Sequence, residues 1–148
     1  QESQLVFRGT GGSIDCVAML TDKQFVSGSD QGDLQLWSNH KKKPIYTVPS
    51  AHGDGSWISS IASYPRSDVV ASGSSDGSVR FWEANVDDVE LREIGSVDVE
   101  GFANGLVFAS SGRFLAVAVG QEHRLGRWWR KKGVRSGVAF IDLQGALS

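Results

Sequence analysis

The sequence predicts an all-β fold built from three repeated four-stranded units. A tryptophan-ending motif recurs, with Trp37 and Trp82 separated by 45 residues, and such a period is typical of repeat folds. Apolar and polar residues alternate with a period of two, as in strands, and no segment shows the period of an amphipathic helix. The 18 glycines fit frequent tight turns. With 148 residues, 40% of them hydrophobic, the chain can bury one ordinary core.

The first two units are defined by a glycine-rich turn followed by a strand that ends in tryptophan. Residues 27–37 read SGSDQGDLQLW, and residues 72–82 read SGSSDGSVRFW. Because these segments match position by position, we expect the same turn and the same strand in both units. The flanking strands are expected at 13–20, 44–48, 57–64 and 91–97.

The third unit is more divergent. Its strands are expected at 102–109, 114–120, 123–129 and 138–143, with 123–129 as the tryptophan-bearing third strand. Two alignments are open, with either Trp128 or Trp129 as the terminal tryptophan. The first would turn Arg127 inward, where a lone charge is costly, so we favour Trp129, with a bulge near Gly126. A further strand at 3–8 precedes the first unit, which gives about thirteen strands in all.

A four-stranded repeat of about 40–45 residues that ends in tryptophan resembles the WD-repeat blade of a β-propeller. The resemblance covers essentially the whole chain, residues 1–148, with blades at roughly 9–48, 52–97 and 101–143 and with strand 3–8 left from a preceding blade. Propellers have about four to eight blades, so three cannot close a ring. The predicted fold is therefore a partial WD40 β-propeller, the C-terminal part of a larger one.

The resemblance implies a polar brace inside the second blade, a hydrogen-bonded chain from Asp through His and Ser to the indole N–H. Its members are His52, Ser72, Asp76 and Trp82. A Ser-His-Asp set also suits nucleophilic catalysis, but each residue falls at its brace position. In the first unit Thr10 and Gln31 stand where the His and Asp would be, and the third unit has neither residue.

The charge of the chain changes sign near its C-terminus. Residues 1–119 hold nine basic and fifteen acidic residues, whereas residues 120–148 hold six basic and two acidic ones. Clustered cations of this kind contact phosphates, and Arg can also stack on unpaired bases. The candidate RNA-binding residues are Arg124, Arg127, Arg130, Lys131, Lys132 and Arg135, with Lys41, Lys42 and Lys43 as a second run.

Both basic runs are expected in the connection between the third and fourth strands of their blades. Corresponding loops leave a propeller on the same face, so the two runs would contribute to one patch. The acidic stretch VDDVE at 86–90 lies in the matching loop of the second blade and would interrupt that patch. A solvated loop without a ligand, and a rim that meets an acidic protein, remain alternatives.

The segment VGQEHRLGRWWRKKG at 119–133 is similar to the final blade of one WD-repeat family, the U3 small nucleolar RNA-associated (Rrp9) family. QLVFRGTGGSIDCV at 4–17 and AHG at 51–53 are also similar, although Thr10 stands where family members tend to have His. The resemblance implies a nucleolar, non-enzymatic component of the U3 particle that acts in pre-rRNA processing for the small ribosomal subunit. The partners that it implies are the box B/C region of U3 RNA, a kink-turn-binding core protein, other small-subunit processome proteins and the remaining blades.

The alternative function is a WD-repeat scaffold for proteins without direct RNA contact, since one fold hosts many functions. Catalysis and a cofactor are not expected, because the three His lie in separate contexts and no phosphate-binding loop opens a helix. No paired Cys or His spacing indicates a metal site. The single cysteine, Cys16, excludes an intrachain disulfide, and no apolar run is long enough to span a membrane.

Overall fold

The computed structural model describes residues 5–9, 11–85, 87–123, 126–130, 133 and 135–146, without the side chains of 123, 126–130, 145 and 146. The described part is almost entirely β. The elements are β1 (Ile14–Met19), β2 (Gln24–Ser29), β3 (Leu34–Ser38), β4 (Tyr46–Val48), β5 (Ile58–Ser63), β6 (Val69–Ser74), β7 (Ser78–Asn85), β8 (Glu90–Asp98), β9 (Phe102–Phe108), β10 (Phe114–Gly120), β11 (Glu122–His123), β12 (Gly126–Arg130), β13 (Gly137–Asp142) and a single helical turn, α1 (Leu143–Ala146).

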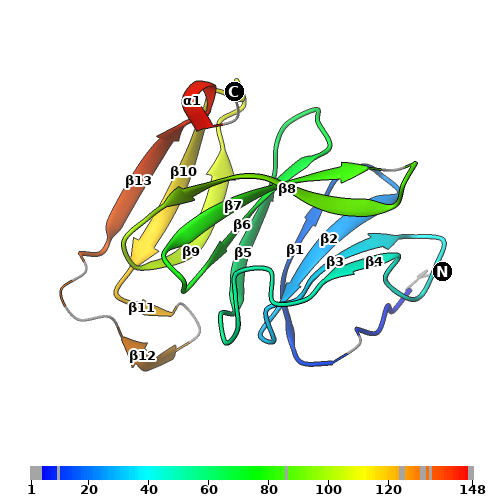
Figure 1. Ribbon diagram of the computed structural model, residues 1–148, viewed down its shortest axis with the longest axis horizontal. Coiled ribbons are helices and arrows are strands. Elements are labelled where there is room, and N and C mark those ends of the chain that lie inside the picture. Colours follow the sequence, from blue (N-terminus) through cyan, green and yellow to red (C-terminus); the bar gives the residue numbers. More distant parts are fainter. Residues whose placement is uncertain are drawn as a thin grey trace, which may run out of the picture.

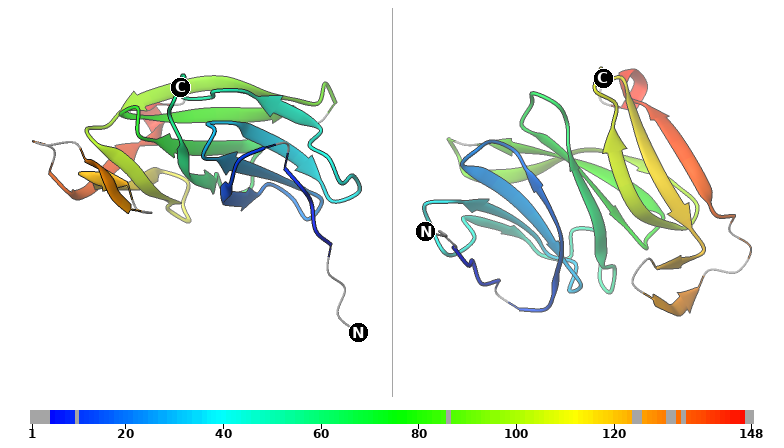
Figure 2. Two further views of the ribbon diagram at one scale, coloured as in Figure 1. Left: turned by 90° about the horizontal axis from the view of Figure 1, so that it is seen from below. Right: turned by 180° about the vertical axis from the view of Figure 1, so that it is seen from behind.

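Apart from the two-stranded sheet of β11 and β12, the described strands form three antiparallel sheets that fan out side by side (Figures 1 and 2). The first has the order β1-β2-β3-β4, the second β5-β6-β7-β8 and the third β13-β10-β9. Sequential up-and-down order in each sheet is the arrangement of propeller blades. The predicted all-β partial propeller is therefore confirmed, and the three sheets are called blades 1, 2 and 3 below.

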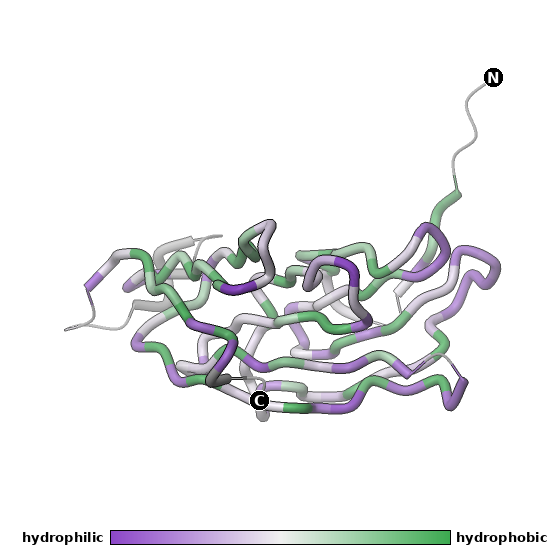
Figure 3. Tube along the Cα trace, turned by 90° about the horizontal axis from the view of Figure 1, so that it is seen from above, coloured by the Kyte–Doolittle hydropathy of each residue, from purple (hydrophilic) through white to green (hydrophobic). Residues whose placement is uncertain are grey.

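The repeated turn is built in the same way in blades 1 and 2. Gly32 and Gly77 follow β2 and β6 with φ of 84° and 83°, a left-handed conformation that favours glycine. Hydrophilic residues crowd the connections between strands, while hydropathy alternates along the strands themselves (Figure 3). The local sequence thus sets where each blade turns.

Blade 2 is buried on both faces, and each face packs on a different neighbour. Val70 and Trp82 lie in an apolar cluster shared with Val26 and Leu36 of blade 1. The opposite face contributes Phe81, fully buried, to a second cluster shared with blade 3. Because neighbouring side chains on a strand point to opposite faces, a strand between two blades carries apolar residues at consecutive positions.

The prediction for the outer half of blade 3 is wrong. Residues 138–143 were expected as the fourth strand, but β13 pairs directly with β10, with Leu115 opposite Ile141, and so takes the third position. The expected third strand, 123–129, instead lies in a separate two-stranded sheet formed by β11 and β12. The physical reason is packing, because Ile141 is buried and completes the cluster between blades 2 and 3. Neither Trp128 nor Trp129 is therefore the blade tryptophan.

The predicted N-terminal strand over 3–8 is also not formed in the described residues 5–9. A strand needs a neighbour to satisfy its backbone groups, and a strand of a preceding blade would pair outside this chain. Instead, Phe7 lies over the outward face of blade 1, edge-on to Phe25 and Trp37 at ring-centroid distances of 5.6 and 6.1 Å. This contact covers part of the face that blade 1 turns away from blade 2.

Candidate nucleic-acid interface

The four predicted brace residues of blade 2 form one chain of hydrogen bonds. The indole Nε1 of Trp82 donates to Ser72 Oγ over 2.8 Å. His52 Nε2 lies 2.7 Å from the same oxygen, and His52 Nδ1 lies 3.0 Å from Asp76 Oδ1. Ser78 adds its hydroxyl to Asp76 Oδ2 at 2.8 Å. The chain connects the turn after β6 to β7 and to the segment before β5.

The direction of these bonds follows from the donors available. The indole can only donate, so Ser72 accepts from Trp82 and is free to donate its own proton to His52 Nε2. With neutral imidazole, the Nδ1–H of His52 then donates to the carboxylate of Asp76. Ser72 is fully buried and His52 is 2% exposed, so no substrate reaches this hydroxyl in the observed conformation. The arrangement suits a structural brace and not a nucleophile.

The brace shifts the titration of Asp76. Burial alone would raise the pKa of the Asp76 carboxyl. The hydrogen bonds from His52 and Ser78, and the positive charge of His52 when protonated, outweigh burial and lower that pKa below its ordinary value of 3.8. A carboxyl with a lowered folded-state pKa stabilises the fold above the unfolded-state value, and this contribution disappears as the pH falls through the folded-state value.

We therefore expect an acid-sensitive contribution from Asp76 at pH values below about 4. The variant Asp76→Asn should be less stable than the parent at pH 7, and its stability should fall less between about pH 5 and pH 2. Urea unfolding of the full-length protein at several pH values measures both quantities. If the parent and the Asp76→Asn variant lost the same free energy of unfolding over this pH range, protonation of Asp76 would not be coupled to folding.

Blades 1 and 3 keep less of the brace. In blade 1 the indole of Trp37 donates to Ser27 Oγ over 2.8 Å, Gln31 is exposed, and Thr10 lies outside the described residues. In blade 3 the positions that match Trp82 and Ser72 hold Ile141 and Val117. An apolar pair replaces a polar pair there, so no buried donor is left without an acceptor.

Residues 121–136, which we call the basic insertion, separate β10 from β13 in blade 3. Asn104 Nδ2, on the innermost strand β9, donates to the carbonyl of Glu122 over 2.8 Å. At the base of the insertion, the backbone N–H of Gln121 donates to Ser136 Oγ over 3.4 Å. These contacts attach the insertion to the blade. Sequence reasoning missed Asn104, because a lone Asn in a strand carries no motif.

Most of the predicted RNA-binding side chains lie outside the described residues. The structure describes the backbone but not the side chains of Arg127 and Arg130, and it describes nothing of Arg124, Lys131 and Lys132. Arg135 is described and exposed. It lines a pocket of about 340 Å³ between the end of β8 and the start of β13.

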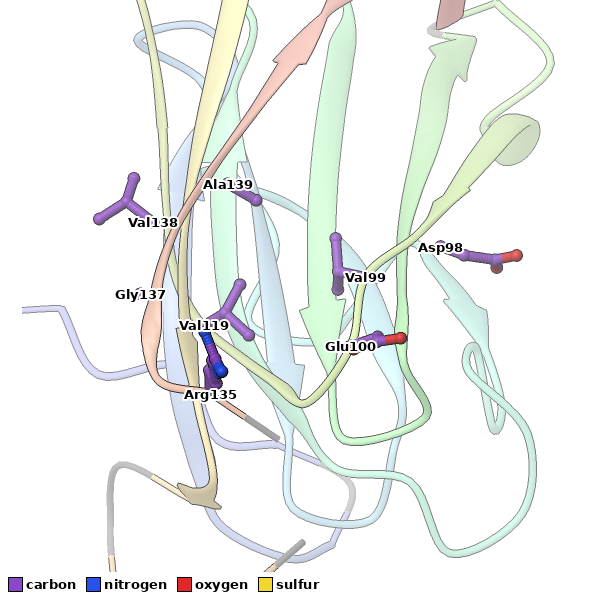
Figure 4. A pocket seen from close by; sticks show the side chains of 8 residues that line it. All are labelled: Asp98, Val99, Glu100, Val119, Arg135, Gly137, Val138 and Ala139. Atoms are coloured by element: carbon purple, nitrogen blue, oxygen red, sulfur yellow. The ribbon is translucent and has the colours of Figure 1, made fainter. Parts of the chain in front are cut away.

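The surroundings of Arg135 are of mixed charge. Figure 4 shows its side chain beside Val119, with Glu100 and Asp98 on the other side of the pocket. Among the described residues Arg135 forms no ion pair, whereas Arg80 and Arg92 are paired with carboxylates. Arg135 is therefore available for an anion, although the two acidic side chains reduce the positive potential of the pocket.

The predicted common patch of the two basic runs is wrong. The β3–β4 connection contains Lys41, Lys42 and Lys43. This connection and the β7–β8 connection lie at the same end of the sheets, which we call the β3–β4 side. The insertion joins β10 to β13, and its strands β11 and β12 lie with the β2–β3 and β6–β7 turns at the other end, which we call the β2–β3 side. Figure 1 shows the separation, with β11 and β12 at the lower left and the β3–β4 connection at the right.

Other classes of site find no support in the described part of the chain. It holds no group of three or more His, Cys, Asp or Glu side chains placed to bind a metal ion. Cys16 forms no disulfide and is half-buried. None of the described helices has the length and apolar character needed to cross a membrane.

Comparison with known proteins places this geometry in a family. The model of the WD domain, G-beta repeat matches residues 1–38 and 42–83. U3 small nucleolar RNA-interacting protein 2 is 44% identical in Homo sapiens and 42% identical in Mus musculus, in each case over 97% of this chain and 32% of the relative. Ribosomal RNA-processing protein 9 of Saccharomyces cerevisiae is 31% identical over 90% of this chain and 30% of its own length.

Two solved structures are similar over nearly the whole chain. The crystal structure of RRP9 WD40 repeats and the structure of U3-55K each superpose with a TM-score of 0.91 at 44% identity. Each match covers 95% of this chain and 45% or 46% of the solved one, and the chain spans about a third of the length of its curated relatives. On its repeats, its blades and the matched residues, this chain belongs to the WD domain, G-beta repeat family.

Proposed function

We propose that this chain is part of a non-enzymatic RNA-associated propeller of the U3 small nucleolar ribonucleoprotein. The observation that carries the proposal is the similarity, over 97% of the chain, to proteins named for their interaction with U3 small nucleolar RNA. The proposed setting is the nucleolus, where the protein would act in pre-rRNA processing for the small ribosomal subunit. Proposed partners are the box B/C region of U3 RNA, a kink-turn-binding core protein and other processome proteins.

Within the chain, the basic insertion is the proposed RNA contact. Its six cations, Arg124, Arg127, Arg130, Lys131, Lys132 and Arg135, make residues 120–148 net positive in a chain whose overall net charge is −2. Phosphate contacts dominate the affinity of nucleic-acid binding and need little shape beyond clustered positive charge. The hydrogen bonds at the ends of the insertion, from Asn104 to Glu122 and from Gln121 to Ser136, support the proposal, because anchored ends reduce the entropy that a segment loses on binding.

Charge reversal tests the proposal. In the full-length protein, Arg130→Glu, Lys131→Glu and Lys132→Glu together should weaken binding to U3 RNA by at least about tenfold at moderate salt. The slope of log affinity against log salt should fall by about 2, because three phosphate contacts to a single strand are lost. Filter binding or fluorescence anisotropy over a salt series measures both.

The matched control makes the same charge change on the β3–β4 side. Lys41→Glu, Lys42→Glu and Lys43→Glu together should leave the U3 RNA affinity and its salt slope close to those of the parent. If both triple variants lost affinity equally, binding would follow net charge and not the insertion. If neither lost affinity, these blades would act as a protein scaffold and RNA would be bound elsewhere in the protein.

A further inference from the structure

The β3–β4 side carries a groove that the proposed RNA contact does not use. It has a volume of about 430 Å³ and runs between the β3–β4 connection of blade 1 and Val89 in the β7–β8 connection of blade 2. The lining residues are Gln24, Ser38, Lys41, Lys43, Pro44, Ile45 and Val89. A second hollow of about 500 Å³ shares Gln24 and Ser38 with it and adds Lys23 and His40.

The groove combines an aliphatic lining with two cations. Pro44 and Ile45 are half-buried and Val89 is 37% exposed, while Lys41 and Lys43 are exposed. Neither lysine forms an ion pair within the described residues. Lysines with unpaired amines beside apolar surface favour a ligand that carries carboxylates next to an aliphatic side chain.

Val89 adds a second, independent observation. Its φ is 53°, a left-handed conformation that is strained for a β-branched residue. Strain of this kind persists where the surrounding structure imposes it, and it is concentrated at binding sites. Here it holds an exposed valine at the edge of the groove, opposite the lysines of the neighbouring blade.

Among the described residues, the carboxylates of the neighbouring loop form no ion pair with the lysines. Asp87 and Asp88 precede Val89, and the Asp88 carboxylate accepts from Asn85 Nδ2 over 2.9 Å. The backbone N–H groups of Asp87 and Asp88 both donate to Asn85 Oδ1, so the loop is closed on itself. Among the described residues that line the two hollows, Asp22 of the second hollow is the acidic one.

These features select against RNA at this groove. Asp22, Asp87 and Asp88 would repel a phosphate chain that ran beyond the lysines. Among the described residues, no aromatic residue and no arginine lines the groove, so this lining offers no surface on which a base stacks. A short peptide places one or two carboxylates at the lysines and avoids the neighbouring acids.

We propose that this groove binds an acidic segment of a partner protein, with carboxylates at Lys41 and Lys43 and an aliphatic side chain between Ile45 and Val89. The two ends of the blades would then hold different partners, a protein on the β3–β4 side and RNA on the β2–β3 side. The inference goes beyond the proposed function and does not depend on it. It rests on the groove alone.

Zero-length cross-linking tests the proposal directly. A carbodiimide joins a lysine amine to a carboxylate in contact with it by an amide bond. Complexes purified through the tagged full-length protein should give cross-links from Lys41 and Lys43 to Asp or Glu of one acidic segment in another chain. Lys42 is the matched control, because it is exposed in the same run and does not line the groove.

Variants separate the outcomes. Lys41→Glu with Lys43→Glu should reduce co-purification of the cross-linked protein by about tenfold, whereas Lys42→Glu should leave it unchanged. Ile45→Ser should also reduce it, which a purely electrostatic contact would not require. Equal cross-linking at all three lysines, or ultraviolet adducts of RNA on residues 41–45, would overturn the proposal. U3 RNA should stay bound to the Lys41→Glu, Lys43→Glu variant even if the RNA-binding proposal fails at the insertion.

Discussion

Replacing His52 with Ala should lower the free energy of unfolding by about 3 kcal/mol. The imidazole contacts Ser72 on one side and Asp76 on the other, at 2.7 and 3.0 Å. Its removal takes one hydrogen-bond partner from the carboxylate of Asp76, which keeps only the Ser78 hydroxyl at 2.8 Å among the brace contacts, and opens a hole beside the buried hydroxyl of Ser72. Both effects cost free energy, because a half-satisfied polar chain is worse than none.

Urea unfolding of the full-length protein at pH 7 measures this loss. His40→Ala is the matched control, because it removes an exposed imidazole from the β3–β4 connection and should change stability by less than about 0.5 kcal/mol. Similar small effects in both variants would show that the observed hydrogen bonds do not stabilise blade 2.

Replacing Gly73 with Ala should cost about 1–3 kcal/mol, because it forces blades 2 and 3 apart. A Cβ at Gly73 would lie 2.7 Å from the Cβ of Ala103 and 2.9 Å from its carbonyl oxygen. That carbonyl also accepts from Ser59 and Ser60 at 2.8 and 2.7 Å, so the backbone of β9 is held in place. The close approach of the inner strands therefore requires a glycine at this position.

Gly137→Ala is the matched control, since nothing lies within 4 Å of a Cβ at Gly137 and its φ is not left-handed. This substitution should stabilise the protein by about 0.4–1 kcal/mol, because it restricts only the unfolded chain. Opposite signs of the two changes in thermal or urea unfolding are the expected result. A destabilisation of equal size at both positions would indicate a general loss of strand propensity or flexibility and not a clash between blades.

The sequence was sufficient for the parts of the fold that rest on local patterns. The SGSDQG and SGSSDG segments predicted blades 1 and 2. A turn that needs a left-handed glycine, followed by a strand that ends in tryptophan, is recognisable in the sequence alone. The brace was found for the same reason, since His52 and Trp82 stand at fixed places within one repeat. In each case the information lies within about 45 residues of the chain.

Blade 3 could not be read in this way. The sequence around Trp128 and Trp129 has the pattern expected at the end of a third strand. The third strand of the structure is β13, in which Ile141 occupies the position of the blade tryptophan. The choice between them depends on pairing with β10 and on packing against blade 2, which are long-range contacts. With 123–129 as the third strand, the basic run is predicted in the connection between the third and fourth strands. That connection is at the same end of the sheets as Lys41, Lys42 and Lys43, whereas the structure has the insertion between the second and third strands.

We propose that the cations of the insertion between β10 and β13, and not Lys41, Lys42 and Lys43, contact RNA. Ultraviolet cross-linking of the full-length protein in cell extract, with mass-spectrometric mapping of the modified peptide, tests it most directly. We predict nucleotide adducts from U3 RNA within residues 120–135 and none at residues 41–43. Adducts at 41–43, or adducts confined to parts of the protein outside this chain, would contradict the claim.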